Sequence, residues 1–162
     1  MNKGLFTNVC KKVGLYKAFK DYPVQMCHFH QKKVIQRYIT MHPGLEAGKD
    51  LKKLMYNLTS TTQTIFTKKL NEWYEKYKDF LAEKTINPDT QKASFTHQKL
   101  VSAYKSLVTH LPHLFTYKNE KDILIHNTTN AIDGGVFSPM KKLLKIHNGF
   151  TKSLKLKWLM II

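Results

Sequence analysis

Residues 66–81 read FTKKLNEWYEKYKDFL, and the apolar side chains in this segment recur at steps of three and four. The repeating positions are Phe66, Leu70, Trp73, Tyr74, Tyr77, Phe80 and Leu81. This spacing places the apolar groups on one face of an α-helix, where they bury against neighbouring elements. The segment predicts a long amphipathic helix from a cap at Thr59-Ser60 to about Lys84, with its aromatic rings in the core rather than stacked on bases.

The segments on either side of this helix are also mostly typical of helices. We expect helices over residues 30–41, 45–58, 96–111, about 130–147 and from about 151, with a short helix or turn at 14–20. An apolar run at 24–29 predicts a buried strand, and 114–117 and 123–125 are short candidate extended segments. Pro112 is expected to end the helix before it, and Asn87-Pro88-Asp89 to form a loop. The sequence therefore predicts a mainly α fold with one or two short strands.

The composition indicates a folded domain with an anionic partner. The chain has 162 residues, of which 42% are hydrophobic, so a sizeable core is expected. It carries 27 Lys and Arg against 11 Asp and Glu, a net charge of +16. Such a charge favours binding to nucleic acid and, less often, to an anionic membrane surface.

The cysteines and the chain ends favour a cytoplasmic protein without a membrane partner. Two cysteines, Cys10 and Cys27, do not make a disulfide framework. Residues 1–6 lack the long apolar run of a signal peptide. The apolar end at 158–162 is much shorter than the roughly 20 residues that a membrane span needs.

The segment NTTNAIDGG, residues 127–135, leads from small polar residues to a single acid, Asp133. An acid in the first turn of a helix is stabilised by the helix dipole, so an ordinary surface acid is one interpretation. Gly134 and Gly135 follow it, although glycine costs about 1 kcal/mol in a helix, and this suggests that a partner approaches the backbone closely. Positive charge then follows at Lys141, Lys142, Lys145 and His147. An acid beside a basic face is the arrangement that phosphodiester chemistry uses.

The segment VQMCHFH, residues 24–30, contains Cys27 and His30 with two residues between them. The pair could contribute to a zinc site, which would need two further ligands. Alternatively, Cys27 is a buried residue at a strand end, with His28 and His30 on the surface. The residue types alone leave both interpretations open.

Taken together, the two segments resemble the C-terminal half of the catalytic domain of mutator-type insertion-sequence transposases. That family shows Asn-Thr-x-Asn, an acid followed by Gly, and a basic helix that closes with His-x-Gly. The matching residues are Asn127, Thr128, Asn130, Asp133, Gly134, His147 and Gly149, with Asp133 where the family usually has Glu. The family also carries a Cys or Asp, two residues and a His before this motif, which Cys27 and His30 match.

The resemblance implies a partial ribonuclease-H-like (α/β) catalytic domain over residues 1–162, with an α-helical insertion at about 44–112 and the third acid on the helix at 127–149. It implies a role in catalysis for Asp133, Cys27 and His30, with Asp133 as a Mg²⁺ ligand in intact relatives. It further implies contacts with double-stranded DNA at element ends, through Asn127, Asn130, Lys141, Lys142, Lys145 and His147. Cys27 and His30 would lie near the metal and position the DNA.

The family cuts DNA with three acids, and this chain matches only the last. No acid precedes Gly14-Leu15, where the second is expected, and the first would lie upstream of Met1. We therefore expect a truncated transposase that binds DNA and is inactive in transposition by itself, and that pairs with full-length transposase or with itself. The alternative is a non-enzymatic basic nucleic-acid-binding protein.

Overall fold

The computed structural model describes residues 6–7, 23–120, 122, 124–130, 133–146, 149 and 151–159. The predicted short helix or turn at 14–20 lies outside these residues, as do Cys10 and His147. The chain divides into two compact units, residues 1–128 and 129–162, and each is considered by itself. As expected, the structure is mainly helical, and it includes a small antiparallel sheet of two strands.

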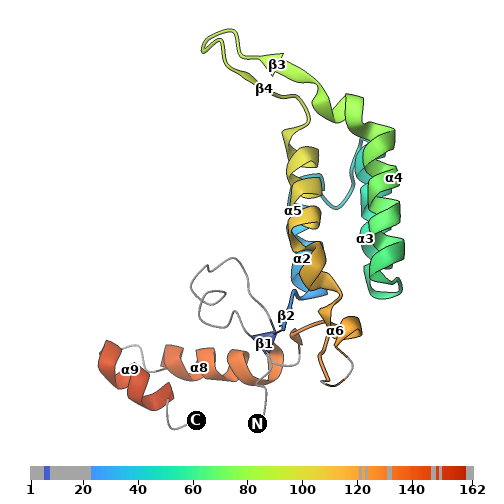
Figure 1. Ribbon diagram of the computed structural model, residues 1–162. Coiled ribbons are helices and arrows are strands. Elements are labelled where there is room, and N and C mark those ends of the chain that lie inside the picture. The colour runs from blue at the N-terminus through green and yellow to red at the C-terminus, as the bar shows by residue number, and fades with distance from the viewer. Residues whose placement is uncertain are drawn as a thin grey trace. The chain divides into compact units, whose positions relative to one another are not determined.

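The first unit contains short strands and the longest helices. Its elements are β1 (Phe6–Thr7), β2 (Val24–Gln25), α2 (His28–Ile39), α3 (Glu46–Tyr56), the 3₁₀ helix η1 (Asn57–Thr59), α4 (Gln63–Ala82), β3 (Lys84–Ile86), β4 (Ala93–Phe95), α5 (Gln98–Leu114) and α6 (Thr116–Asn119). Helix α2 lies beside α5, and α3 lies beside α4 (Figure 1). The hairpin of β3 and β4 extends from the end of α4 and returns the chain to α5 (Figure 1).

The core of this unit is formed by the apolar stripes that the sequence indicates. On α4, Phe66, Leu70, Trp73 and Leu81 are buried, and Tyr77 and Phe80 pack against the core. Tyr74 stays at the surface and stacks on Tyr104 of α5, with ring centroids 4.6 Å apart. The indole Nε1 of Trp73 donates to the carbonyl oxygen of Ala47 at 2.9 Å and so fixes α4 against α3.

The start of α4 differs from the prediction. Thr59 belongs to η1, and the cap is Thr62, whose side chain accepts a hydrogen bond from the amide of Ile65 at 3.4 Å. The predicted cap at Thr59-Ser60 is therefore wrong. Asn87 does begin a loop as expected, since its side chain accepts from the amides of Asp89 and Thr90. The hairpin on either side of this loop was not predicted, because its strands are largely exposed and lack an apolar alternation.

Helix α5 continues past Pro112 to Leu114, so the prediction that this proline ends the helix is wrong. Pro112 has no amide hydrogen to donate to the carbonyl of Val108, so the helix continues at the cost of one backbone hydrogen bond. The carbonyl of His113, in the last turn of the helix, accepts from the amide of Met26 at 2.7 Å. The predicted extended segment at 114–117 is also wrong, because Thr116 begins α6, and residues 124 and 125 form no strand.

Strand β2 is shorter than the run that predicts it. Only Val24 and Gln25 are extended, and they pair in parallel with Phe6 and Thr7 of β1. Helix α2 already begins at His28, two residues before the predicted start. It ends at Thr40, whose φ of 67° does not continue a helix.

The second unit contains the predicted basic helix in two parts. Residues Asp133–Phe137 form the π-helix η2, and Ser138–Ile146 form α8, followed by α9 (Lys152–Leu159). Gly149 lies in a turn, and the residues that join it to Ile146 lie outside the described part of the chain. None of the helices in the described ranges has the length and apolar character of a membrane span.

Candidate functional site

Within the first unit, Asn127 contacts the segment that contains Cys27 and His30. The backbone amide of His28 donates to the carbonyl oxygen of Asn127 at 2.9 Å. This bond joins the first turn of α2 to the residue that opens the Asn-Thr-x-Asn motif. Cys27 and His30 lie in the same turn of chain, Cys27 as the residue before α2 and His30 within the first turn of the helix.

Cys27 is buried, as one of the two interpretations of this segment expects, and His30 is half-buried. His28 is 1% exposed, so the expectation that it lies on the surface is wrong. The reason is the early start of α2, which puts His28 on the face that also carries Gln31, Ile35 and Ile39. This face packs toward α5.

His28 holds the end of α5 through its side chain. Its Nε2 lies 2.6 Å from the carbonyl oxygen of Leu114, and because a carbonyl only accepts, Nε2 carries the hydrogen. In the neutral ring the other nitrogen, Nδ1, therefore carries no hydrogen. It is buried and has no hydrogen-bond partner among the described residues. Burial lowers the pKa of His28 from its ordinary value, more than the bond to Leu114 raises it, and Lys32 and Lys118 lower the pKa further.

Gln25 completes this junction of β2, α5 and α6. Its side-chain amide donates to the carbonyl oxygen of Leu114 at 3.1 Å, and its Oε1 accepts from the amide of Tyr117 at 2.9 Å. The hydroxyl of Thr116 donates to the carbonyl oxygen of Val24 at 2.7 Å. These buried polar groups make a rigid support for the Cys27–His30 turn. Sequence reasoning missed Gln25, which is buried in a strand of only two residues.

The remaining predicted site residues lie in the second unit, apart from Asn127. Lys141, Lys142 and Lys145 are exposed on α8, and Asn130 is exposed ahead of η2. The backbone of Asp133 begins η2, while the side chain of Asp133 and all of His147 lie outside the described part of the chain. Among the described residues, a Cβ added at Gly134 or Gly135 would meet nothing within 4 Å, so packing against them does not require either glycine.

The predicted metal centre includes one acid of the motif, Asp133. Among the described side chains, no group of three or more His, Cys, Asp or Glu residues is placed to hold a metal ion. The Asn127 motif itself supplies one carboxylate, Asp133, whereas a two-metal centre needs several. The donor set in the motif therefore does not fit a complete Mg²⁺ centre, and no step through a metal follows from these residues.

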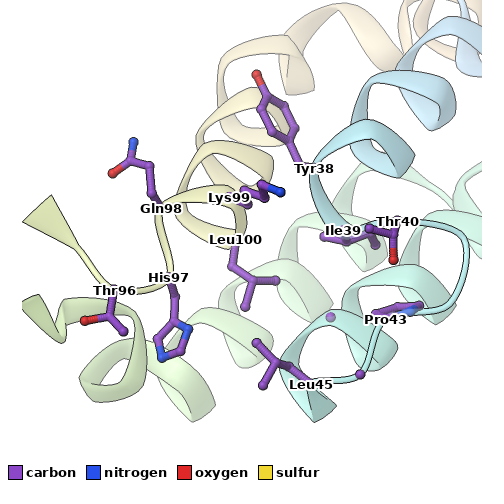
Figure 2. Close-up of a pocket in the computed structure, with 12 residues that line it drawn as sticks. Tyr38, Ile39, Thr40, Pro43, Leu45, Thr96, His97, Gln98, Lys99 and Leu100 are labelled. Atoms are coloured by element: carbon purple, nitrogen blue, oxygen red, sulfur yellow. The ribbon is translucent and has the colours of Figure 1, made fainter. Parts of the chain in front are cut away.

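A pocket of about 430 Å³ lies elsewhere in the first unit, between the end of α2, the start of α3 and the start of α5. Figure 2 shows the side chains of Leu45, His97 and Leu100 converging on it. Its lining is mainly apolar, and His97 is bound to Glu83, with Nε2 and Oε2 3.1 Å apart. None of the residues in the two motifs lines this pocket.

Comparisons of the chain with protein-family models, with curated proteins and with solved structures found no match. The resemblance therefore depends on the two sequence motifs.

Proposed function

We propose that this chain is a DNA-binding protein related to the catalytic domain of mutator-type transposases, and that it binds duplex DNA through α8 without cutting it. The observation that carries the proposal is the hydrogen bond from the His28 amide to the Asn127 carbonyl. Asn127, the residue that opens one motif, lies beside the turn that carries the other motif, although the two are far apart in sequence.

The parallel pairing of β1 and β2 supports a ribonuclease-H-like interpretation of the first unit. Parallel strands require a crossover connection of about a dozen or more residues, usually through a helix. Residues 8–23 provide a connection of sufficient length between Thr7 and Val24. In this interpretation β1 and β2 belong to the catalytic sheet, and most of α3, α4, β3, β4 and α5 forms the helical insertion.

The local structure at Asp133 supports a functional role for this segment. π-Helices are rare, and they occur frequently at functional sites. This one contains two glycines that no contact with the described part of the chain requires, and it is followed by three exposed lysines, Lys141, Lys142 and Lys145. The two glycines have no side chains, so a DNA phosphate backbone can approach the protein backbone closely there, next to the positive charge of the lysines.

DNA binding, rather than cleavage, is the activity proposed for this chain. Intact relatives use Mg²⁺ held by three acids to cleave and transfer strands, and Asp133 is the one such acid that the motifs contain. The proposed partners are duplex DNA at element ends and, by self-association or with full-length transposase, another protein chain. We assign the protein to the cytoplasm.

The test is the salt dependence of binding to a duplex of random sequence, measured by fluorescence anisotropy. The variant Lys141→Gln/Lys142→Gln/Lys145→Gln should bind less tightly, and the slope of log K against log salt should fall by about 2.7, at about 0.9 per phosphate contact. The control variant Lys68→Gln/Lys69→Gln removes two exposed lysines of α4 and should leave the slope unchanged. A chain that binds no duplex at low salt, or a triple variant with an unchanged slope, contradicts the proposal.

A second candidate, a non-enzymatic nucleic-acid binder with no relation to transposition, is favoured by the net charge of +16 alone. The two proposals differ in specificity. A transposase relative should prefer its element ends over unrelated duplexes, whereas a general binder should bind both equally. Nicking of element ends in Mg²⁺ or Mn²⁺ that Asp133→Asn abolishes would show that the chain retains catalysis, against the proposal.

A further inference from the structure

The exposed face of α2 carries an aromatic ring and two cations in a line. Phe29 is 43% exposed, and Lys33 and Arg37 are exposed four and eight residues further along the helix. Side chains four residues apart lie on one face of a helix, separated by about 6 Å along its axis. The opposite face holds the buried residues His28, Gln31, Ile35 and Ile39.

Acidic residues are segregated away from this face. Helices α2 and α5, which lie side by side, contain no Asp or Glu, whereas α3 and α4 contain Glu46, Asp50, Glu72, Glu75 and Asp79. None of the ion pairs between described residues involves Lys33 or Arg37. Their charges are therefore available to an anion from outside, and the ring of Phe29 lies beside them, with the Nζ of Lys33 5.5 Å from its centroid.

We propose that Phe29, Lys33 and Arg37 form a binding site for single-stranded nucleic acid, in which a base stacks on Phe29 and the backbone phosphates lie along Lys33 and Arg37. Exposed aromatic rings beside a row of cations are how proteins hold single strands, because each base has a flat face and each link carries a charge. Duplex bases are already stacked and offer no such face to the ring. The inference rests on the proposed nucleic-acid binding and assigns a second surface to it.

The position of this surface adds to the argument. Phe29 lies between His28 and His30, in the helical turn whose backbone is bound to Asn127. Support from β2, α5 and α6 holds this turn rigid, so the ring is presented on a fixed backbone. A strand on α2 would therefore pass beside the Cys27–His30 turn.

Phe29→Ala tests the stacking contact, with Tyr56→Ala as its matched control. Tyr56 is also exposed and also has a lysine near its ring, with the Nζ of Lys52 5.8 Å from the centroid, but Glu46 and Asp50 are on the same helix. With labelled oligothymidine as the probe, Phe29→Ala should weaken binding by about 5- to 150-fold, the effect of losing one base stack. Tyr56→Ala should bind the oligothymidine as the unaltered chain does, and duplex binding should persist in both variants.

Lys33→Gln/Arg37→Gln tests the phosphate contacts independently of the ring. The salt slope for oligothymidine should fall by about 1.4, at about 0.7 per contact on a single strand. The pair Lys68→Gln/Lys69→Gln should leave that slope unchanged. Thermal unfolding and circular dichroism should show the same fold in all variants, since every altered side chain is exposed.

The outcomes separate this inference from the proposed function. If the chain binds duplex through α8 but does not bind oligothymidine, or if Phe29→Ala and Lys33→Gln/Arg37→Gln bind it unchanged, the inference is wrong and the proposed function stands. Equal loss of single-strand binding in Tyr56→Ala also overturns it. If the chain binds neither probe, both proposals are wrong.

Discussion

The backbone amide of His28 donates to the carbonyl oxygen of Asn127 at 2.9 Å, while the side chain of His28 reaches the carbonyl oxygen of Leu114 at 2.6 Å. One residue thus fixes the start of α2 to two distant segments of the chain. Because the ring is buried and its Nδ1 has no partner in the described structure, the neutral form is the one that fits.

His28 should make the protein sensitive to mild acid. Its pKa in the folded protein is lower than the ordinary 6.5, chiefly because of burial, so the unfolded chain binds the proton first. The free energy of unfolding should be greatest above about pH 6.5 and should fall as the pH drops below that value. Urea unfolding between pH 8 and pH 5 measures this loss.

His28→Gln should reduce that pH dependence, because an amide can donate to Leu114 but does not titrate. Some dependence should persist through His113, whose pKa burial also lowers. His28→Ala should cost about 0.5–1.5 kcal/mol at pH 8 through the lost hydrogen bond, because the carbonyl of Leu114 keeps its bond from Gln25. His126→Gln, at an exposed histidine, is the control, and a pH dependence equally reduced in that variant would count against the role of His28.

Leu107 and Val108 are adjacent on α5 and should respond very differently to truncation. Leu107 is fully buried, and Leu107→Ala should lower the free energy of unfolding by about 2–5 kcal/mol through lost burial and a cavity. Val108 is 45% exposed, and Val108→Ala should change the free energy of unfolding by about 0.5 kcal/mol or less. Chemical denaturation of both variants measures the contrast, and similar values would refute this packing of α5.

Gly48 should not tolerate a methyl group. A Cβ at this position of α3 would lie 2.8 Å from the Cβ of Pro43, so Gly48→Ala forces the loop or the helix to move. The strain, about 1–3 kcal/mol, should exceed the gain of about 1 kcal/mol from helix propensity. Gly44→Ala is the control in the same loop, because its added Cβ meets nothing within 4 Å. A Gly48→Ala variant with a raised melting temperature would contradict the close contact.

Gly135 should show the opposite behaviour. Nothing lies within 4 Å of an added Cβ, so Gly135→Ala should leave the stability unchanged or raise it by up to about 1 kcal/mol. If the glycine leaves room for a DNA backbone, the same change should weaken duplex binding. Anisotropy and thermal unfolding of this one variant measure both effects, and unchanged DNA affinity would remove the close approach from the proposal.

Asp50 links α3 to α4 and should contribute stability that is lost in strong acid. Hydrogen bonds from Lys76 at 2.9 Å and from Tyr77 at 2.7 Å lower the pKa of Asp50 to about 2. The contribution is complete above about pH 4 and is lost as the pH falls toward 2.

Asp50→Asn should lower the free energy of unfolding by about 1 kcal/mol at pH 7, a small effect because the pair of Asp50 and Lys76 is partly exposed. The variant should also lose less stability than the unaltered chain as the pH falls from 4 to 2. Glu72→Gln, at an exposed acid of α4, is the control. Urea unfolding from pH 7 to pH 2 measures this difference. If Asp50→Asn loses as much stability in acid as the unaltered chain does, Asp50 is not the group responsible.

The helices of the first unit were predictable because their apolar periodicity is local information. The stripe from Phe66 to Leu81 indicates both that α4 exists and which face is buried, and the structure confirms this, apart from the exposed Tyr74. The hairpin of β3 and β4 was not predictable, since exposed strands carry no apolar alternation. The extension of α5 beyond Pro112 was missed because a distant amide, that of Met26, satisfies the carbonyl of His113.

The candidate site likewise has features that the local sequence predicts and features that it does not. A buried Cys27 was one of two interpretations of its segment. That interpretation placed His28 on the surface, because the local sequence does not show where the helix begins. The meeting of His28 with Asn127 depends on the whole path of the chain between them.

By itself, the sequence determined the helical class, the apolar stripes, the basic charge and the two motifs, because each is a property of composition or of near neighbours. The tertiary structure decided which motif residues lie together, which histidine is buried, and that α2 presents Phe29, Lys33 and Arg37 away from the core. The physical reason is that burial and hydrogen bonding between distant segments depend on how helices pack, and local preferences do not specify that packing.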